Sequence, residues 1–85
     1  MNNKLEILKK RLIYRAGYRG TKEMDILLSA FVNKYINSFD ENLLHELDIF
    51  LNFEDEIILD YYLYNTVKNE IDKNKISKIF KNFKI

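Results

Sequence analysis

Cysteine and proline are absent from this chain of 85 residues, and glycine occurs only twice. Without cysteine there is no disulfide framework, no zinc knuckle and no thiol nucleophile, so a domain of this size must be held together by helix packing. Sandwiches and barrels need many turns, which glycine and proline commonly supply. The composition therefore predicts one all-α domain over residues 1–85.

A strong excess of one charge and long apolar runs are missing as well. Fourteen Lys and Arg residues face 13 Asp and Glu residues, which leaves a net charge of +1, whereas a dedicated nucleic-acid binder is expected to carry a strongly basic face. No segment approaches the roughly 20 continuous apolar residues that cross a bilayer. The opening residues MNNKLEILKKRL interrupt their apolar run with Glu6 and lack the cleavage site of a secretory signal. We expect a cytoplasmic protein with no nucleic-acid partner and no direct membrane insertion.

Apolar residues recur at helical spacing in five segments, which predicts a compact small five-helix bundle. We expect helices over residues 2 or 3 to 15, 21–37, 38–52, 54–64 and 73–83. The first is expected to begin at Asn2 or Asn3 and the second at Thr21, since each is a good N-cap. Ser38 and Glu41 have the spacing of a capping box, which predicts the start of the third helix.

Both glycines lie in one stretch, Tyr14 to Asp25, which has the sequence YRAGYRGTKEMD. Gly17 and Gly20 separate the first two predicted helices, and a glycine permits either a positive φ or the close approach of another surface. We therefore expect a tight helix-to-helix corner. Arg19 lies on this corner, and Glu23 follows it at the start of the second helix, where the helix dipole favours a carboxylate. An Arg-Gly-x-x-Glu corner is a candidate recognition surface.

Groups that could carry out chemistry are few. The single histidine, His45, falls on the polar side of a predicted helix and has no nucleophile or companion ligands in an obvious pattern, so we expect it to be exposed. The carboxylates between Glu54 and Asp60 lack the ligand loop of an EF-hand and are explained by the first turn of a helix. No phosphate-binding loop or dinucleotide fingerprint is present. We therefore predict a protein that is not an enzyme, with no catalytic, metal or cofactor-binding residues.

The corner also carries a basic strip interleaved with aromatic residues: Tyr14, Arg15, Tyr18 and Arg19. Such a strip can stack on and clamp a nucleotide, which makes a nucleic-acid or nucleotide binding module one hypothesis. It can equally form a protein interface, where Tyr and Arg are the enriched anchors. A third interpretation is a plain turn with Arg19 solvated. The spacing of the residues leaves all three open.

Three parts of the chain carry a resemblance to a known family: residues 11–15 (RLIYR), residues 18–28 (YRGTKEMDILL) and Phe31. The match continues through Leu43, Glu46-Leu47 and Phe50-Leu51, and more loosely through residues 54–63. This ordered pattern closely resembles the signature of the SdhE family, the small FAD assembly factors of succinate dehydrogenase that are also called flavinators. The resemblance covers roughly the first three quarters of the chain and ends near Tyr64.

The resemblance implies a five-helix fold and a non-catalytic partner of the flavoprotein subunit of succinate dehydrogenase, and in some bacteria of fumarate reductase. Members of the family promote covalent attachment of FAD to a histidine of that subunit. The implied setting is the bacterial cytoplasm, the chain is expected to be a monomer when free, and FAD is expected to belong to the client and not to be bound tightly by this chain.

The family's Arg-Gly-x-x-Glu motif falls on Arg19, Gly20 and Glu23. We expect seven residues at the corner to bind the partner: Arg19, Gly20, Glu23, Arg15, Tyr18, Lys22 and Asp25. The chain departs from the family pattern in two places. It has Gly17 where relatives often carry an aromatic residue, and it has Tyr61 or Tyr62 in place of a tryptophan in the segment 54–63.

Overall fold

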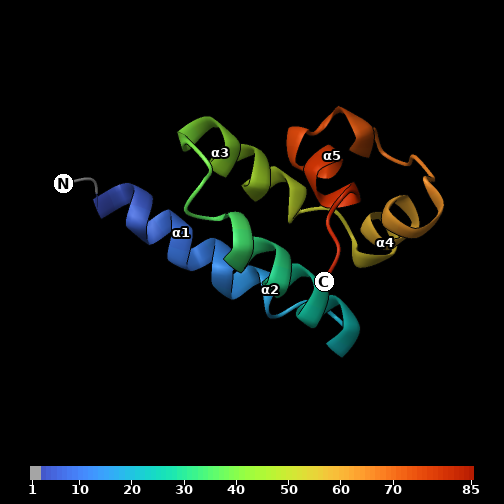
Figure 1. The fold of residues 1–85 in the computed structure, drawn as a ribbon, viewed down its shortest axis with the longest axis horizontal. Coiled ribbons are helices and arrows are strands. Elements are labelled where there is room, and N and C mark those ends of the chain that lie inside the picture. The colour runs from blue at the N-terminus through green and yellow to red at the C-terminus, as the bar shows by residue number, and fades with distance from the viewer. Residues whose placement is uncertain (1–2) are drawn as a thin grey trace.

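The computed structural model describes the backbone of residues 3–85 and the side chains from residue 4 onward. This part of the chain contains helices and no strands, and its elements are α1 (Asn3–Ala16), α2 (Lys22–Tyr35), α3 (Glu41–Phe50), α4 (Asp55–Tyr64), the 3-10 helix η1 (Ile71–Lys73) and α5 (Lys75–Lys81). The predicted all-α fold with five α-helices is confirmed (Figure 1). The proposed N-cap at Asn2 or Asn3 lies outside the described side chains.

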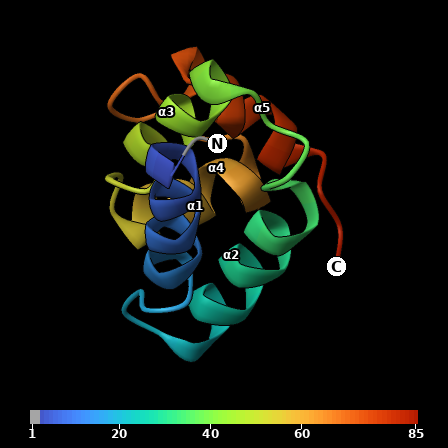
Figure 2. The same cartoon turned by 90° about the vertical axis from the view of Figure 1, so that its left-hand side faces the viewer.

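The helices form two groups that share one core. α1 and α2 run side by side in opposite directions, joined by the glycine corner, and α1 also packs against α3 (Figures 1 and 2). At the other end of the molecule α5 packs against α3, α4 and η1. Among the described helices, none combines the length and apolarity that crossing a bilayer requires.

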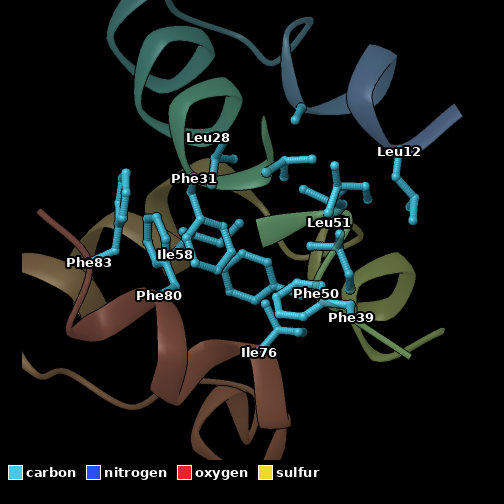
Figure 3. Close-up of a cluster of buried hydrophobic side chains, with 14 of the residues drawn as sticks. Leu12, Leu28, Phe31, Phe39, Phe50, Leu51, Ile58, Ile76, Phe80 and Phe83 are labelled. Carbon is cyan, nitrogen blue, oxygen red and sulfur yellow. The ribbon is translucent and has the colours of Figure 1, made fainter. Parts of the chain in front are cut away.

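Three fully buried phenylalanines from three different helices join these groups. Phe31 of α2 meets Phe80 of α5 edge to face, with ring centroids 5.1 Å apart, and Phe50 of α3 lies 5.4 Å from Phe80 on another side (Figure 3). Aromatic pairs of this kind contribute about 0.5–1.5 kcal/mol beyond the area that they bury. The last quarter of the chain is therefore part of the core, since it supplies Phe80 and the buried Phe83.

One predicted helix start differs from the structure and another agrees with it. The third helix is capped by Asp40, whose Oδ1 accepts from the backbone N–H of Leu43 at 2.9 Å, so the predicted capping box at Ser38 is wrong. Asp40 is the cap because it lies directly before the first helical residue, Glu41, where a side-chain oxygen reaches the third helical amide. The second prediction holds: Thr21 caps α2 and accepts from the N–H of Met24 at 3.3 Å.

The fifth helix is shorter than predicted, because the chain first makes η1 and then restarts at Asn74. The buried Asn74 side chain accepts from the amides of Ile76 and Ser77 at 2.8 and 3.2 Å and donates to the carbonyl of Glu46 at 3.0 Å. One asparagine thus caps α5 and fastens it to α3. Of the two tyrosines named for the segment 54–63, Tyr61 is buried and Tyr62 is half-buried.

Candidate functional site

The glycine corner between α1 and α2 is tight because of close packing. Neither glycine has a positive φ, so that reason for their presence is wrong. A Cβ atom on Gly20 would lie 3.2 Å from Oδ2 of Asp55, and one on Gly17 would lie 3.1 Å from Oγ of Ser29. The surface that approaches Gly20 is thus the N-terminal end of α4 in the same chain.

Arg19 points into the molecule and not toward solvent, with only 10% of its side chain exposed. Its Nε donates to Oδ1 of Asp55 at 2.7 Å. Its Nη1 donates to the carbonyl of Leu51, and its Nη2 donates to the carbonyl of Phe53, both at 2.7 Å. Each of the three nitrogens of the guanidinium group is therefore engaged inside the fold. The interpretation of a plain turn with a solvated Arg19 is wrong.

The partners of Arg19 explain why a cation belongs there. Leu51 is the C-cap of α3, where backbone carbonyls lack helical partners and the helix dipole is negative. Asp55 begins α4, where the dipole favours a carboxylate, and its Oδ2 also accepts from the N–H of Gly20 at 2.9 Å. We call Arg19, Gly20 and Asp55 the corner clamp, because they tie the corner to the end of α3 and the start of α4.

Two further contacts fix the backbone and the end of α1. The N–H of Arg19 donates to Oδ1 of Asp25. Arg15 donates to Oδ1 of Asp48 and, through Nη2, to Oδ1 of Asn52 at 2.6 Å, so it also holds α3. Both arginines of the basic aromatic strip are thus paired within the fold, which leaves the nucleotide hypothesis without free cations at these two positions.

The seven residues predicted to bind a partner divide into two sets. Three are part of the scaffold, half-buried and hydrogen-bonded: Arg15, Arg19 and Asp25. Four are exposed and are brought together on the surface of the corner: Tyr18, Gly20, Lys22 and Glu23. We call these four the corner surface. The partner role of all seven stays a prediction.

The corner surface has an aromatic edge. The rings of Tyr14 and Tyr18 stack with centroids 4.4 Å apart, and their exposed fractions are 62% and 70%. Among the described residues, Glu23 makes no hydrogen bond or ion pair with Arg19, so its carboxylate is directed to solvent and not to the motif's arginine. The exposed groups are those available to another molecule.

The acceptors of the corner clamp carry no recognisable signal of their pairing in the sequence. Asp55 was assigned only a helix-dipole role, and nothing in one sequence pairs it with Arg19, 36 residues away. The signal that could have raised the question is its place at the start of a helix that follows a short turn.

Other titratable groups form no second site in residues 3–85. His45 is exposed as expected, with 60% of its side chain accessible, and Nε2 lies 3.8 Å from Oε2 of Glu41. The described residues contain no cluster of three or more side chains suited to a metal ion and enclose no pocket. Burial, followed by the charge of Asp72, raises the pKa of Tyr61, which lies in the core and not at the corner.

Comparison with known proteins gives consistent relatives. Residues 10–84 match the family described as "Flavinator of succinate dehydrogenase". The succinate dehydrogenase assembly factor 2 of Scheffersomyces stipitis is 43% identical over 81 residues, covering 91% of this chain and 52% of the relative. The protein of the same name from Debaryomyces hansenii is 36% identical, with coverages of 91% and 55%. The protein of the same name from Saccharomyces cerevisiae is 40% identical over 65 residues, covering 76% of this chain and 38% of the relative. No solved structure gives a significant match.

These relatives correct the predicted cellular setting, and their greater length limits what can be assigned to this chain. They are named as mitochondrial proteins of eukaryotes, so the prediction of a bacterial cytoplasmic protein is wrong. The absence of a membrane-spanning run and of a secretory signal, on which the cytoplasmic prediction rested, does not distinguish the two settings, and the bacterial setting was implied only by the resemblance. The chain spans about half the length of the first two relatives. None of the matches supports the nucleic-acid hypothesis, and the family match extends past Tyr64 through the fifth helix. The match covers residues 10–84, and this chain belongs to the family of flavinators of succinate dehydrogenase.

Proposed function

We propose that this chain is an assembly factor that binds the flavoprotein subunit of succinate dehydrogenase and promotes the covalent attachment of FAD to that subunit. The observation that carries the proposal is the family match over residues 10–84, nearly the whole chain. Relatives named succinate dehydrogenase assembly factors support it, although the chain corresponds to only about half of their length.

The corner surface is the proposed point of contact. Its exposed groups are a tyrosine ring, a backbone without a side chain at Gly20, a cation and a carboxylate. The corner clamp holds this surface to two other helices through charge-assisted hydrogen bonds, which are stronger than neutral ones. A surface that is already ordered loses little conformational entropy on binding, so more of the contact energy appears as affinity.

We infer that the chain acts by binding and supplies no chemical group to the flavin. The sequence has no cysteine, and its one histidine lies exposed on α3 with an acidic neighbour. If the corner surface fits the subunit only when FAD is held against the acceptor residue, binding shifts the subunit toward that state by the difference in affinity for the two states. The covalent chemistry and the FAD itself then belong to the client.

Calorimetry tests this proposal with the flavoprotein subunit from the same organism, its acceptor histidine replaced by serine so that FAD stays non-covalent. We expect the chain to bind the FAD-loaded subunit at least about tenfold more tightly than the FAD-free subunit, a difference of about 1.4 kcal/mol. Free FAD is expected to give no saturable heat with the chain alone. Equal affinity for both forms of the subunit, or tight binding of free FAD to the chain, contradicts the proposed mode of action.

A further inference from the structure

The outward side of α1 is a second exposed surface that the corner does not explain. Apolar and aromatic side chains lie along its middle: Ile7 is 57% exposed and Tyr14 is 62% exposed. Lys4 and Arg11 lie one turn to either side of Ile7 along the helix, and Lys10 borders Tyr14, so positive charges flank the apolar line. We call these five residues the α1 strip.

The cations of the α1 strip differ from the other cations of this helix. Arg15 is paired with Asp48, and Lys9 lies 4.0 Å from Glu6. Within the described residues, the side chains of Lys4, Lys10 and Arg11 take part in no ion pair, and all three are exposed. Three uncompensated positive charges around an apolar line favour a partner surface with negative charges around an apolar patch.

The α1 strip is continuous with the corner surface. Tyr14 belongs to the strip, Tyr18 belongs to the corner, and their rings stack. In Figures 1 and 2, α1 lies at the periphery, with α2 and α3 on its inner side. A molecule that covers the corner surface therefore meets the α1 strip with little further reach.

An anionic membrane would also attract cations, but the strip is a poor membrane-binding face. Helices that lie on membranes bury a broad face of Leu, Phe or Trp in the lipid. Here the leucines of α1 face the protein core, with Leu12 fully buried and Leu8 packed against the core. The outward side offers a single aliphatic residue, Ile7, and the hydroxyl-bearing ring of Tyr14.

We propose that the α1 strip extends the corner surface and contacts an acid-rimmed apolar patch of the same flavoprotein subunit. This inference rests on the proposed function, and it assigns different kinetic roles to the charged residues and the apolar residues of the strip. The cations of the strip accelerate association by long-range attraction, because exposed charges at the edge of an interface act mainly on the association rate. The Tyr14–Tyr18 stack and Ile7 slow dissociation, because they are buried on binding.

The charge part of the proposal is tested by surface plasmon resonance with Lys10→Glu/Arg11→Glu. We expect the association rate to fall about tenfold at about 50 mM salt, with the dissociation rate changed less than about twofold. The difference is expected to disappear near about 1 M salt, where the Debye length is about 3 Å. The matched control is Lys78→Glu/Lys84→Glu, which changes the net charge equally at exposed positions of the C-terminal segment. It is expected to leave the association rate within about twofold.

The aromatic part is tested by Tyr14→Ser, with Tyr64→Ser as the control on another exposed tyrosine, at the end of α4. We expect Tyr14→Ser to raise the dissociation rate about tenfold and Tyr64→Ser to leave it unchanged. Circular dichroism and thermal melting identify any variant that fails to fold, and Tyr14→Phe, which keeps the ring, is expected to restore slow dissociation.

Each other outcome overturns the inference. Equal losses from the two charge reversals indicate a net-charge effect, and unchanged rates in all variants indicate that the client does not touch α1. If the α1 variants lose only binding to phosphatidylcholine vesicles that contain phosphatidylglycerol, the strip meets a membrane instead. In all three cases the wild-type chain still binds the subunit and the proposed function stands. Absence of wild-type binding overturns both.

Discussion

Arg19 is a motif residue whose side chain lies beneath the proposed recognition surface and not on it. Its guanidinium group is bonded to Asp55 and to two carbonyls around the end of α3, so its first effect is on the position of the corner. Glu23, the other charged residue of the motif, is exposed and separate from this arrangement. Substitutions of these two residues should therefore weaken partner binding for different reasons. A change at Arg19 disturbs the scaffold of the corner, whereas a change at Glu23 alters its exposed surface.

Asp55→Ala tests the corner clamp by leaving the largely buried guanidinium of Arg19 and the amide of Gly20 without their carboxylate. We expect the free energy of unfolding to fall by about 1–3 kcal/mol, since hydrogen bonds to charged groups contribute about this much. Urea denaturation at neutral pH measures the change. Glu56→Ala, an exposed acid in the same helical turn, is the matched control and should change stability by less than about 0.5 kcal/mol. Equal effects of the two substitutions would show that the helix dipole, and not the clamp, accounts for the contribution of Asp55 to the free energy of unfolding.

Gly20→Ala separates binding from folding at the corner surface. The φ of Gly20 is not positive and the added Cβ meets a carboxylate at 3.2 Å, so we expect a stability loss below about 1 kcal/mol. The new methyl group lies at the edge of the corner surface, beside the carboxylate of Asp55, and we expect the affinity for the flavoprotein subunit to fall about tenfold or more, or about 1.4 kcal/mol. Calorimetry and thermal melting of the same sample give both numbers. Normal affinity would exclude close contact of the client with this backbone.

For the individual elements, apolar periodicity alone was sufficient to predict the helices. The apolar spacing within each segment predicted all five α-helices, because each buries one stripe of side chains in the shared core. Their ends were harder to predict. Ser38 offered a formal capping box, yet Asp40 stands closer to the helix, and η1 is too short at three residues to leave a periodic signal.

Substituting the two candidate caps of α3 in turn shows which one acts. Asp40→Ala removes the oxygen that accepts from Leu43 N–H and should cost about 0.5–2 kcal/mol of stability. Ser38→Ala removes an exposed hydroxyl two residues earlier and should cost less than about 0.5 kcal/mol. Thermal or urea unfolding of both variants is sufficient, and the reverse order of effects would restore the capping box.

Asn74→Ala should be among the more damaging changes outside the aromatic core. It removes the cap of α5 and the bond to the carbonyl of Glu46, leaving two amides and one carbonyl with fewer partners near the core. We expect a loss of about 1–3 kcal/mol in the free energy of unfolding. Asn42→Ala, at an exposed position of α3, serves as the control and should be close to neutral. A neutral Asn74→Ala would mean that α5 is held by its apolar face alone.

At the scale of the whole molecule, the limits of sequence reasoning are long-range contacts. The corner itself was predicted from two glycines and helical spacing, and the seven candidate residues on it came with the family resemblance. The contacts Arg19–Asp55 and Arg15–Asp48 join positions 36 and 33 residues apart, and a single sequence gives no rule for pairing one acid among 13 with one cation among 14. Because the acceptors of Arg19 could not be identified from the sequence, this residue was expected to contact the partner directly.

We propose that this chain is a binding module with a rigid corner and a charged helix face. In this proposal the corner promotes flavin attachment by binding the flavoprotein subunit and not by donating a chemical group. The two possibilities differ in which residues matter, since a gripping role depends on the exposed motif residue Glu23 and a chemical role would depend on the one histidine, His45.

Covalent flavin fluorescence of the flavoprotein subunit on a denaturing gel tests this claim most directly. The subunit, loaded with FAD, is incubated with wild-type chain, Glu23→Ala, Arg19→Ala or His45→Ala at equal folded concentration. We expect the fluorescent band to form at the wild-type rate with His45→Ala, and at least about tenfold more slowly with the two motif variants at subsaturating concentration, because about 1.4 kcal/mol of binding energy is lost. Loss of the band with His45→Ala while its affinity for the subunit is unchanged would contradict the account and indicate a direct chemical role.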